Sequence, residues 1–346
     1  MVGRSLARLL ESRADDLYIG YGLKPRIVAA SDNGGMACDT TGLDCARLIR
    51  AKEHKGTVAA YSDGHGGGGS NGRGGRAPDS SPTAAEMAEA VSGADVLVEA
   101  TPSNYKDAEP GMSNITDAMK RRMHVVSVNK GPLALAFPSL NELAAYNRVM
   151  FRFSGTVGGG TPILDYAKNS LSGERITSFS GILNGTTNYI LSAMADGMSP
   201  KAALQDARSK GYVEADESLD LDGLDAAAKL VILANWVMGM KVTMPDVNCA
   251  GIRGVTSADI KRAAKKSRVV KMTAACGNDA LTVAPVAIPR DDPLCVNGTL
   301  NAISFTSEHS GTQTIIGRGA GGTETASAIL RDLLYIRQGI TSGAYG

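Results

Sequence analysis

The densest group of ionisable side chains lies between Gly211 and Lys229. Six carboxylates precede the first basic residue of this segment: Glu214, Asp216, Glu217, Asp220, Asp222 and Asp225. Asp225 and Lys229 are four residues apart, so a helix would place both on one face. Apolar residues flank Lys229, and a lysine on a mostly buried helix needs a partner or a chemical task. The segment is a candidate acid–base site, although an acidic helix N-terminus with an ordinary ion pair has the same pattern.

Two further polar residues follow apolar runs that are typical of buried strands. Lys130 comes directly after the predicted strand 124–128, and Thr101 ends the predicted strand 94–101. In an open parallel sheet, ligands bind beyond the carboxyl ends of the strands. We therefore expect Lys130 and Thr101 to lie at one ligand-binding edge.

Other catalytic chemistries find little support in the sequence. The four histidines share no metal-binding spacing, and no serine or cysteine stands in a GxSxG-like turn. The five cysteines are scattered, odd in number and without CxxC spacing, which argues against a disulfide framework or a zinc site. This use of cysteine favours a reducing cytoplasm.

The first half of the chain has a parallel α/β pattern. Buried strands are predicted over 26–32, 94–101 and 124–128, with helices over 1–13, 43–54, 83–91 and 113–122. No strand precedes the first helix. The glycine-rich stretch 64–76 lacks the Gly-Lys-Ser/Thr ending of a phosphate loop, so we interpret it as a surface insertion.

The second half of the chain has a different pattern of predicted elements. A turn of small residues at 155–162 follows a strand at 149–154 and leads into a helix that extends to about residue 171. Further strands are predicted over 175–183, 268–275, 281–288 and 300–308, and the last three are expected to be antiparallel. Helices are predicted to start at 184 and to extend over 199–209 and 223–240. The glycine turn 317–322 leads into a helix at 325–336, which we expect to return to the first domain.

Composition sets limits on the function. The 346 residues suggest about two domains, which we place at 1–135 plus 316–346 and at 136–315. The 36 basic and 35 acidic residues nearly cancel, so no broad positive field exists to hold nucleic acid. No apolar run approaches the length that spans a bilayer, and charges interrupt the first ten residues too early for a secretory signal.

Six motifs in one order carry a family resemblance. They are SVNKG (127–131), GTVGGGTP (155–162), GILNGTTNY (181–189), GYVEAD (211–216), GLDAAAK (223–229) and GAGG (319–322). Together they resemble homoserine dehydrogenase from residue 2 to about residue 336. The resemblance implies a Rossmann-type parallel sheet domain and an α+β substrate and dimerisation domain with a mostly antiparallel sheet. It also implies a homodimer and NAD(P)-linked interconversion of L-homoserine and L-aspartate 4-semialdehyde, in threonine, methionine and isoleucine biosynthesis.

The resemblance also implies roles for individual residues. Lys229 matches the acid–base lysine and Lys130 the lysine between cofactor and substrate, while Glu214 and Asp225 match substrate-binding positions, with Asp220 close by. The positions near NAD or NADP are Val2, Gly3, Thr101, Lys130, Gly211 and Gly321. A monovalent cation, Na⁺, would be held by the backbone carbonyls of Ser154, Val157, Gly159 and Thr161, since carbonyl oxygens suit a hard cation.

Two departures from the family pattern leave alternatives open. The chain begins inside the family's first glycine loop, so the first Rossmann strand is expected to be missing, and it ends without room for a regulatory domain. An inactive, dimeric paralogue is therefore one alternative. A semialdehyde dehydrogenase is another, but it would need a cysteine thiolate with a histidine partner. NAD and NADP also stay open, because Asp32 could bind a ribose hydroxyl and Arg47 or Arg50 a 2′-phosphate.

Overall fold

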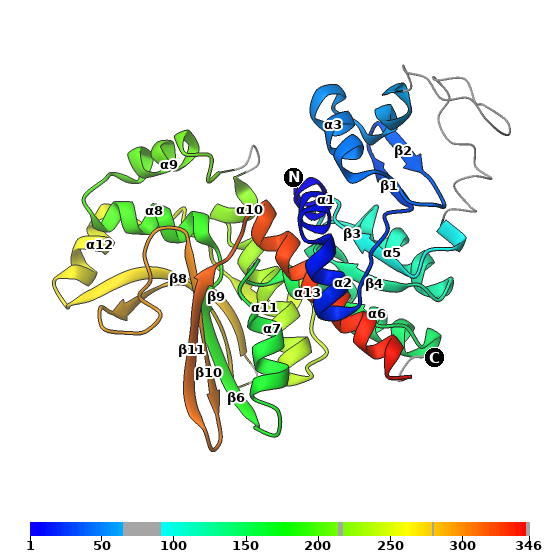
Figure 1. Cartoon of the computed structure of the whole chain (residues 1–346). Coiled ribbons are helices and arrows are strands. Elements are labelled where there is room, and N and C mark those ends of the chain that lie inside the picture. The colour runs from blue at the N-terminus through cyan, green and yellow to red at the C-terminus, as the bar shows by residue number, and fades with distance from the viewer. Residues whose placement is uncertain (65–90, 214–216, 279, 344–346) are drawn as a thin grey trace, which may run out of the picture.

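The computed structural model describes residues 1–64, 91–213, 217–278 and 280–343 (Figure 1). A parallel sheet with its helices forms one region, and a larger, mostly antiparallel sheet forms the other. Both sheets agree with the fold class predicted from the sequence. Residues 65–90, which include most of the predicted insertion and all but the last residue of the predicted helix 83–91, lie outside the described residues.

The parallel sheet has the strand order β3 (Val96–Glu99), β4 (His124–Ser127) and β5 (Phe151–Arg152) among the described residues. Adjacent residues of β4 point into different cores, as expected for a strand covered on both faces. Val125 packs in the core formed with α5 (Gly111–Lys120) and α6 (Lys130–Asn147). Val126 packs in the core that contains Ile329 of α13 (Gly322–Thr341). The predicted strands 94–101 and 124–128 are thus confirmed.

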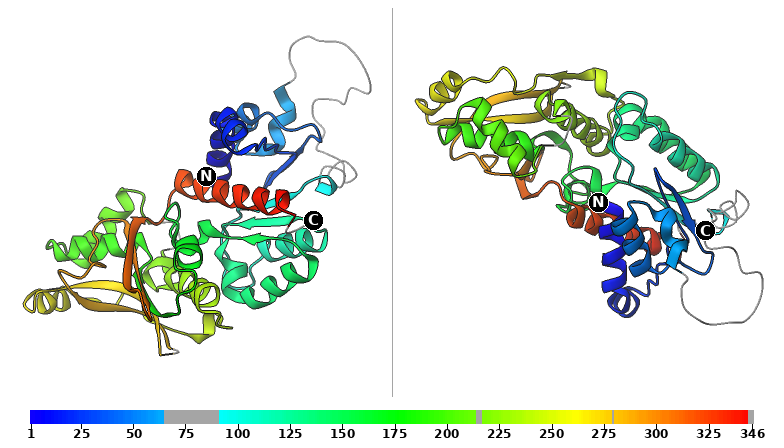
Figure 2. Two further views of the ribbon diagram at one scale, coloured as in Figure 1. Left: turned by 60° about the horizontal axis from the view of Figure 1, so that its bottom comes forward. Right: turned by 90° about the horizontal axis from the view of Figure 1, so that it is seen from above.

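The last helix returns to this sheet, as predicted. α13 lies between the parallel strands and α1 (Val2–Ser12), and it contacts both (Figure 2). Leu6 and Leu10 of α1 are buried in the same core as Ile329 and Ile336 of α13. A short helix, α2 (Ala14–Tyr21), follows α1 and was not predicted.

The strand predicted over 26–32 is shorter and lies elsewhere, so its assignment to the parallel sheet is wrong. β1 (Ala29–Asp32) pairs antiparallel with β2 (Gly35–Cys38), and the two form a separate hairpin. Its two-residue turn is Asn33-Gly34, a sequence typical of tight hairpins. The helix α3 (Cys45–Lys55) and the 3₁₀ segment Val58–Gly64 pack beside the hairpin.

The carboxylate of Asp32 holds this hairpin to the segment that follows α3. Its Oδ1 accepts hydrogen bonds from Gly34 N (2.8 Å) and Thr57 Oγ1 (2.8 Å). Its Oδ2 accepts from Lys52 Nζ (2.7 Å) and Val58 N (2.9 Å). Burial opposes ionisation of Asp32, but the bonds from Lys52, Val58, Thr57 and Gly34 prevail and lower its pKa to about 2.

The larger sheet has six strands in the order β11-β10-β6-β8-β9-β7. All neighbours are antiparallel except β7 and β9. The strands are β6 (Ile176–Ile182), β7 (Val247–Cys249), β8 (Arg268–Gly277), β9 (Ala280–Pro289), β10 (Leu300–Ser307) and β11 (Gly311–Arg318). The four predicted strands are confirmed, whereas β7 and β11 were not predicted.

Helix α11 (Leu224–Met238) connects the two regions. Its residues 226–235 are all buried, and it contacts both the larger sheet and α6 of the parallel region. The other helices of this region are α7 (Ile163–Asp165), the π-helical turn Tyr166–Ser170, α8 (Gly185–Ala195), α9 (Pro200–Ser209), α10 (Ser218–Leu221), the 3₁₀ turn Met244–Asp246 and α12 (Ser257–Ala264). Within the described ranges, none of the helices has the length and apolar character needed to cross a bilayer.

The domain boundaries at 135 and 316 stay predictions. α6 continues through residue 135, and β5 joins the parallel sheet after it. β11 extends through residue 316 as part of the larger sheet. The strand β5 thus lies after the first expected boundary, and the last residues of β11 lie after the second.

We predict that Asp32→Asn lowers the free energy of unfolding by about 1–3 kcal/mol at neutral pH, because a charged acceptor of four hydrogen bonds is lost. The pKa of Asp32 in the folded state, about 2, lies below its ordinary value of 3.8. Its contribution to stability is therefore complete above pH 3.8 and is lost as the pH falls towards 2. Urea unfolding of both proteins at several pH values measures this.

The matched control is Asp15→Asn, because Asp15 is exposed on α2. It should change the unfolding free energy little at any pH. A difference between Asp32→Asn and the unmodified protein that stays constant on acidification would contradict the role given to the Asp32 charge.

Candidate active site

Lys229 lies on the buried face of α11 and is only 6% exposed. Its Nζ donates hydrogen bonds to Asp225 Oδ2 (2.7 Å) and to the backbone oxygen of Leu183 (2.7 Å). The first bond is the contact predicted from the spacing of four residues. Because a lysine ammonium has three N–H donors, one of them is left for a further acceptor.

Asp225 joins two lysines from different regions of the molecule. Lys130 Nζ lies 3.5 Å from Asp225 Oδ1, while Lys229 is bonded to the other oxygen. Burial opposes ionisation of Asp225, but the charges of Lys229 and Lys130 and the hydrogen bonds from Lys229 and Asn184 hold its pKa well below the usual range. Asp225 is therefore a carboxylate at neutral pH and balances part of the charge of both lysines.

Asn184 was not singled out as a site residue, although it was expected near the start of a helix. It is the N-cap of α8, and its Oδ1 accepts from Thr187 N (2.9 Å). This bond turns the amide nitrogen towards the acidic residues: Nδ2 donates to Asp220 Oδ1 (2.6 Å) and Asp225 Oδ2 (3.0 Å). The burial of Asp220, with the charge of Asp225 nearby, raises its pKa despite the bond from Asn184.

Lys130 is placed by the end of β4 and the start of α6. Asn129 caps α6 by accepting from Gly131 N (3.0 Å), and its amide nitrogen donates to Thr101 Oγ1 (3.0 Å). A side chain at Gly131 would come within 2.4 Å of the backbone oxygen of Asn104, so only glycine fits there. Thr101 and Lys130 thus lie on neighbouring strand ends, as expected for one ligand-binding edge.

Thr101 is held by Glu99, a carboxylate that the sequence analysis did not consider. Glu99 is 2% exposed, and its Oε1 accepts from both the backbone nitrogen and the hydroxyl of Thr101. Its Oε2 accepts from Asn114 Nδ2 (2.7 Å). Hydrogen bonds to this buried carboxylate thus fix the end of β3.

The other predicted cofactor positions gather at two helix N-termini. Val2 and Gly3 lie in the first turn of α1, and Gly321 directly precedes α13. A side chain at Gly322 would come within 2.9 Å of side-chain atoms of Met1, so these helix starts are adjacent. Space is open where a side chain at Gly3 would lie. Exposed backbone N–H groups at helix N-termini suit a phosphate group.

Two further positions were predicted, Gly211 for the cofactor and Glu214 for the substrate. Gly211 follows α9, in a left-handed conformation with φ of +72°. Glu214 lies outside the described residues.

The predicted cation loop, residues 154–161, is tied to the turn that precedes α13. Gly158 and Gly159 have left-handed φ values of +84° and +54°, and a side chain at Gly159 would come within 3.0 Å of the backbone of Gly319. Thr161 Oγ1 donates to the backbone oxygen of Arg318 (3.2 Å). The loop also begins at a fixed point, since Ser154 N and Oγ donate to Asp332 of α13 at 2.9 and 2.7 Å.

Charged residues around this fixed point were missed by the sequence analysis. Arg152 bonds both Asp165 (2.6 Å) and Asp332 (3.1 Å), and Arg331 bonds Asp165 (3.2 Å). Burial raises the pKa of Asp332, although Arg152 and Ser154 counteract it. The partners are as many as 180 residues apart, so no local pattern indicates them.

The Asp32 carboxylate, considered above as a ribose ligand, is engaged by four donors of its own region. Arg47, considered for a 2′-phosphate, has its guanidinium 4.5 Å from the ring centroid of Tyr61.

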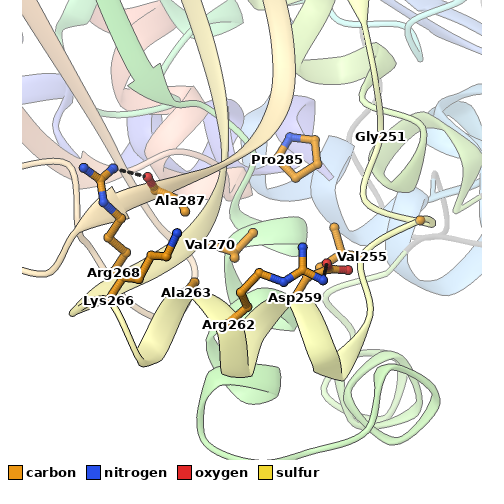
Figure 3. A pocket seen from close by; sticks show the side chains of 11 residues that line it. Gly251, Val255, Asp259, Arg262, Ala263, Lys266, Arg268, Val270, Pro285 and Ala287 are labelled. Carbon is orange, nitrogen blue, oxygen red and sulfur yellow. Dashed lines mark hydrogen bonds and ion pairs between the residues drawn. The ribbon is translucent and has the colours of Figure 1, made fainter.

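A cavity of about 840 Å³ lies between α12 and strands β8 and β9 (Figure 3). Its floor is apolar, with Val255, Val270 and Pro285, and basic side chains such as Arg262 and Lys266 stand at its rim. None of its lining residues belongs to the Lys229 cluster. The charged side chains of the cavity are exposed, as in the Arg262–Asp259 pair, whereas those of the Lys229 cluster are largely buried and converge on one carboxylate. We therefore base the candidate site on the cluster.

Comparisons with known proteins match the chain to one family. The sequence model of the homoserine dehydrogenase family matches residues 162–334. The homoserine dehydrogenase of Methanocaldococcus jannaschii is 40% identical over 336 residues, which are 97% of this chain and 95% of that protein. The NAD(+)-dependent homoserine dehydrogenase of Pseudomonas canavaninivorans is 38% identical over 350 residues, which are 98% of this chain and 94% of that protein.

Solved structures are similar over nearly the same span. A putative homoserine dehydrogenase from Archaeoglobus fulgidus has a TM-score of 0.83 and 35% identity, covering 97% of this chain and 96% of that one. A hyperthermophilic archaeal homoserine dehydrogenase in complex with NADPH has a TM-score of 0.80 and 26% identity, covering 97% and 94%.

The fold, the lysine–carboxylate cluster and these similarities define an NAD(P)-dependent oxidoreductase. Within that class, the chain belongs to the homoserine dehydrogenase family. The findings support this identity and neither the inactive paralogue nor the semialdehyde dehydrogenase considered above.

We predict that Asn184→Ser separates the two roles of Asn184. Serine is a good N-cap, so Asn184→Ser should be about 1 kcal/mol more stable than Asn184→Ala, which loses the cap as well. Both variants lose the amide donor to Asp220 and Asp225. Homoserine turnover should therefore fall in both, measured by kinetics beside denaturant unfolding. Full activity in Asn184→Ser would show that the amide does not matter to the site.

Proposed function

We propose that this chain oxidises L-homoserine to L-aspartate 4-semialdehyde at the cluster of Lys130, Asp225 and Lys229. In the reverse direction it reduces the semialdehyde to homoserine. The observation that carries the proposal is the shared carboxylate: Asp225 brings two lysines from two regions within 3.5 Å of its oxygens. One lysine stands at the cofactor edge of the parallel sheet and the other is buried in the larger region. A substrate between them would meet both.

We assign proton transfer to Lys229. Its ammonium uses two donors on Asp225 and Leu183, which leaves one N–H for the oxygen of the substrate. In the reduction, this proton passes to the carbonyl oxygen as the carbonyl carbon accepts a hydride. In the oxidation, the neutral amine takes the hydroxyl proton back. The ionised Asp225 stabilises the charged lysine that forms.

We assign to Lys130 the polarisation of the same oxygen. Lys130 is more exposed than Lys229, with 22% of its side chain accessible against 8%, and its only contact with Asp225 is a 3.5 Å ion pair. A positive charge held there favours the oxyanion that develops during hydride transfer. The ammonium of homoserine would bind carboxylates, for which we propose Asp220, Asp225 and Glu214.

The described residues fit a nicotinamide cofactor. The adjacent N-termini of α1 and α13, with open space at Gly3, suit its pyrophosphate. We propose Val2, Gly3, Thr101, Lys130, Gly211 and Gly321 as its contacts. When bound, the cofactor supplies or accepts the hydride.

We propose further that the loop 154–161 holds a monovalent cation such as Na⁺ through the backbone oxygens of Ser154, Val157, Gly159 and Thr161. The loop is anchored at Ser154, and two left-handed glycines let its backbone turn sharply. Uncharged carbonyl oxygens from such a loop suit a hard, singly charged ion.

We predict that nicotinamide absorbance rises when the protein receives homoserine and oxidised cofactor, and not with serine or threonine. Lys229→Ala should lower kcat by about 10²–10⁴-fold, the usual effect of losing a positioned acid–base group. Cofactor affinity, measured by calorimetric titration, should stay nearly unchanged. Lys241→Ala, at an exposed position after α11, is the control.

No homoserine-dependent change with either cofactor would refute the proposed activity. If Lys229→Ala keeps most of kcat and Lys130→Ala abolishes it, the roles of the two lysines are reversed.

We propose that the protein is a homodimer, joined through one face of the larger sheet. On this face, Ser180, Ser304 and Thr314 form one cross-strand row, and Ser178, Thr306 and Thr312 form the next. Hydroxyl pairs link the strands, Ser304 with Thr314 (2.7 Å) and Thr306 with Thr312 (3.0 Å). The helices of this region pack on the opposite face, where Phe179 and Phe305 are buried. A flat face of small side chains allows a second sheet to approach closely.

We predict a mass of two chains of 35.8 kDa by light scattering after size exclusion. Ser304→Arg, which places a long charge in the centre of the face, should yield monomers, and Ser209→Arg at the exposed end of α9 should not. A monomeric unmodified protein would exclude the proposed dimer.

A further inference from the structure

Lys271 of β8 is a fully buried lysine that the proposed reaction does not use. Its Nζ donates to Val296 O (2.5 Å), Asn188 Oδ1 (2.8 Å) and Ser192 Oγ (3.1 Å), all uncharged acceptors. Within the described ranges, no carboxylate forms an ion pair with it. Burial lowers the pKa of Lys271, while Cys295 and Asp196 partly counteract this. A cation buried without a counter-ion is costly, so its presence calls for a task.

The acceptors of Lys271 come from two separate segments. Asn188 and Ser192 are one turn apart on α8, and Val296 belongs to the loop between β9 and β10. Asn188 cannot turn away, because its amide nitrogen donates to the backbone oxygen of Leu300 (3.0 Å). Ser192 Oγ donates in turn to the backbone oxygen of Asn188 (2.7 Å). The ammonium therefore ties α8 to the loop 296–300.

The same helix face leads to the Lys229 cluster. Asn184 lies four residues before Asn188, hence on the same side of α8, and it bonds Asp220 and Asp225. The preceding residue, Leu183, provides the backbone oxygen that accepts from Lys229. Asn301 Nδ2, next to the loop, donates to that oxygen as well (3.0 Å). Both segments that Lys271 joins thus end in direct contact with the cluster or with its acceptor.

We propose that Lys271 is a positioning residue for the dehydrogenase reaction: it fixes α8 and the loop 296–300 so that Leu183 and Asn184 hold Lys229 and Asp225 in reactive geometry. This inference rests on the proposed function of that cluster. Lys271 itself contacts none of the reacting groups. Its effect is through placement, and a displacement of about 1 Å at a reacting group can cost about 100-fold in rate.

The test is Lys271→Met, which keeps the length of the side chain and removes its charge and donors. We expect kcat/KM for homoserine to fall at least about tenfold, with cofactor KM changed less than about twofold. Hydrogen exchange, followed by mass spectrometry, should become faster in α8 and in residues 296–301. Lys266→Met, at an exposed position before β8, should change neither measurement.

A second variant covers the case in which Lys271→Met does not fold. Asn188→Ala removes one acceptor, and we expect the same pattern of exchange and a smaller loss of kcat/KM. If Lys271 acts through Asn188, the double variant should lose no more than the more damaged single variant, since the two changes break one connection.

Two results would overturn the inference. One is a variant with faster exchange in α8 but kcat/KM within about twofold of the unmodified protein, which is the outcome of a purely structural role. The other is an equal rise in the KM values of homoserine and cofactor. If the unmodified protein shows no homoserine turnover, the proposed function fails, and the exchange measurement alone decides whether Lys271 fixes α8.

Discussion

The ion cluster on Asp225 is the constraint on which the rest of the site depends. Two ammonium groups that approach each other in a poorly solvated space repel, and a single ionised carboxylate between them makes the arrangement possible. The carboxylate can be in that place only because α11, buried from residue 226 to 235, carries Asp225 and Lys229 one turn apart. Asn184 then fixes the orientation of the carboxylate by its own role as the cap of α8.

The two regions of the molecule contribute to this cluster in different ways. The parallel sheet delivers Lys130 from the end of a strand, where its backbone N–H bonds Ser103 and the preceding Asn129 bonds Thr101. The larger region delivers Lys229 from inside a helix, where packing leaves it little freedom. Contact between α6 and α11 joins the two regions at the cluster itself. The cluster therefore combines a partly exposed lysine from one region with a tightly packed lysine from the other.

Local patterns in the sequence predicted much of the fold and the centre of the candidate site. They did not predict contacts between residues that are distant in the sequence. The spacing of Asp225 and Lys229 determines their contact through helix geometry, and the position of Lys130 after a strand indicates its edge. The bonds of Asp332 with Arg152 and Ser154 join residues about half the chain apart, so periodicity contains no sign of them. β11 was missed because polar residues on its exposed face interrupt the apolar pattern, and β1 was misplaced because an apolar run does not specify its partner strand.

The contact between α1 and α13 has a consequence for synthesis of the protein. The apolar face of α1, with Leu6 and Leu10, is buried against residues that are made more than 300 positions later. A ribosome makes the N-terminal residues first, so this face waits in solvent until the last helix has left the exit tunnel. The parallel layer is therefore completed only after α13 has been made, and until then the nascent protein carries an amphipathic helix without its packing partner.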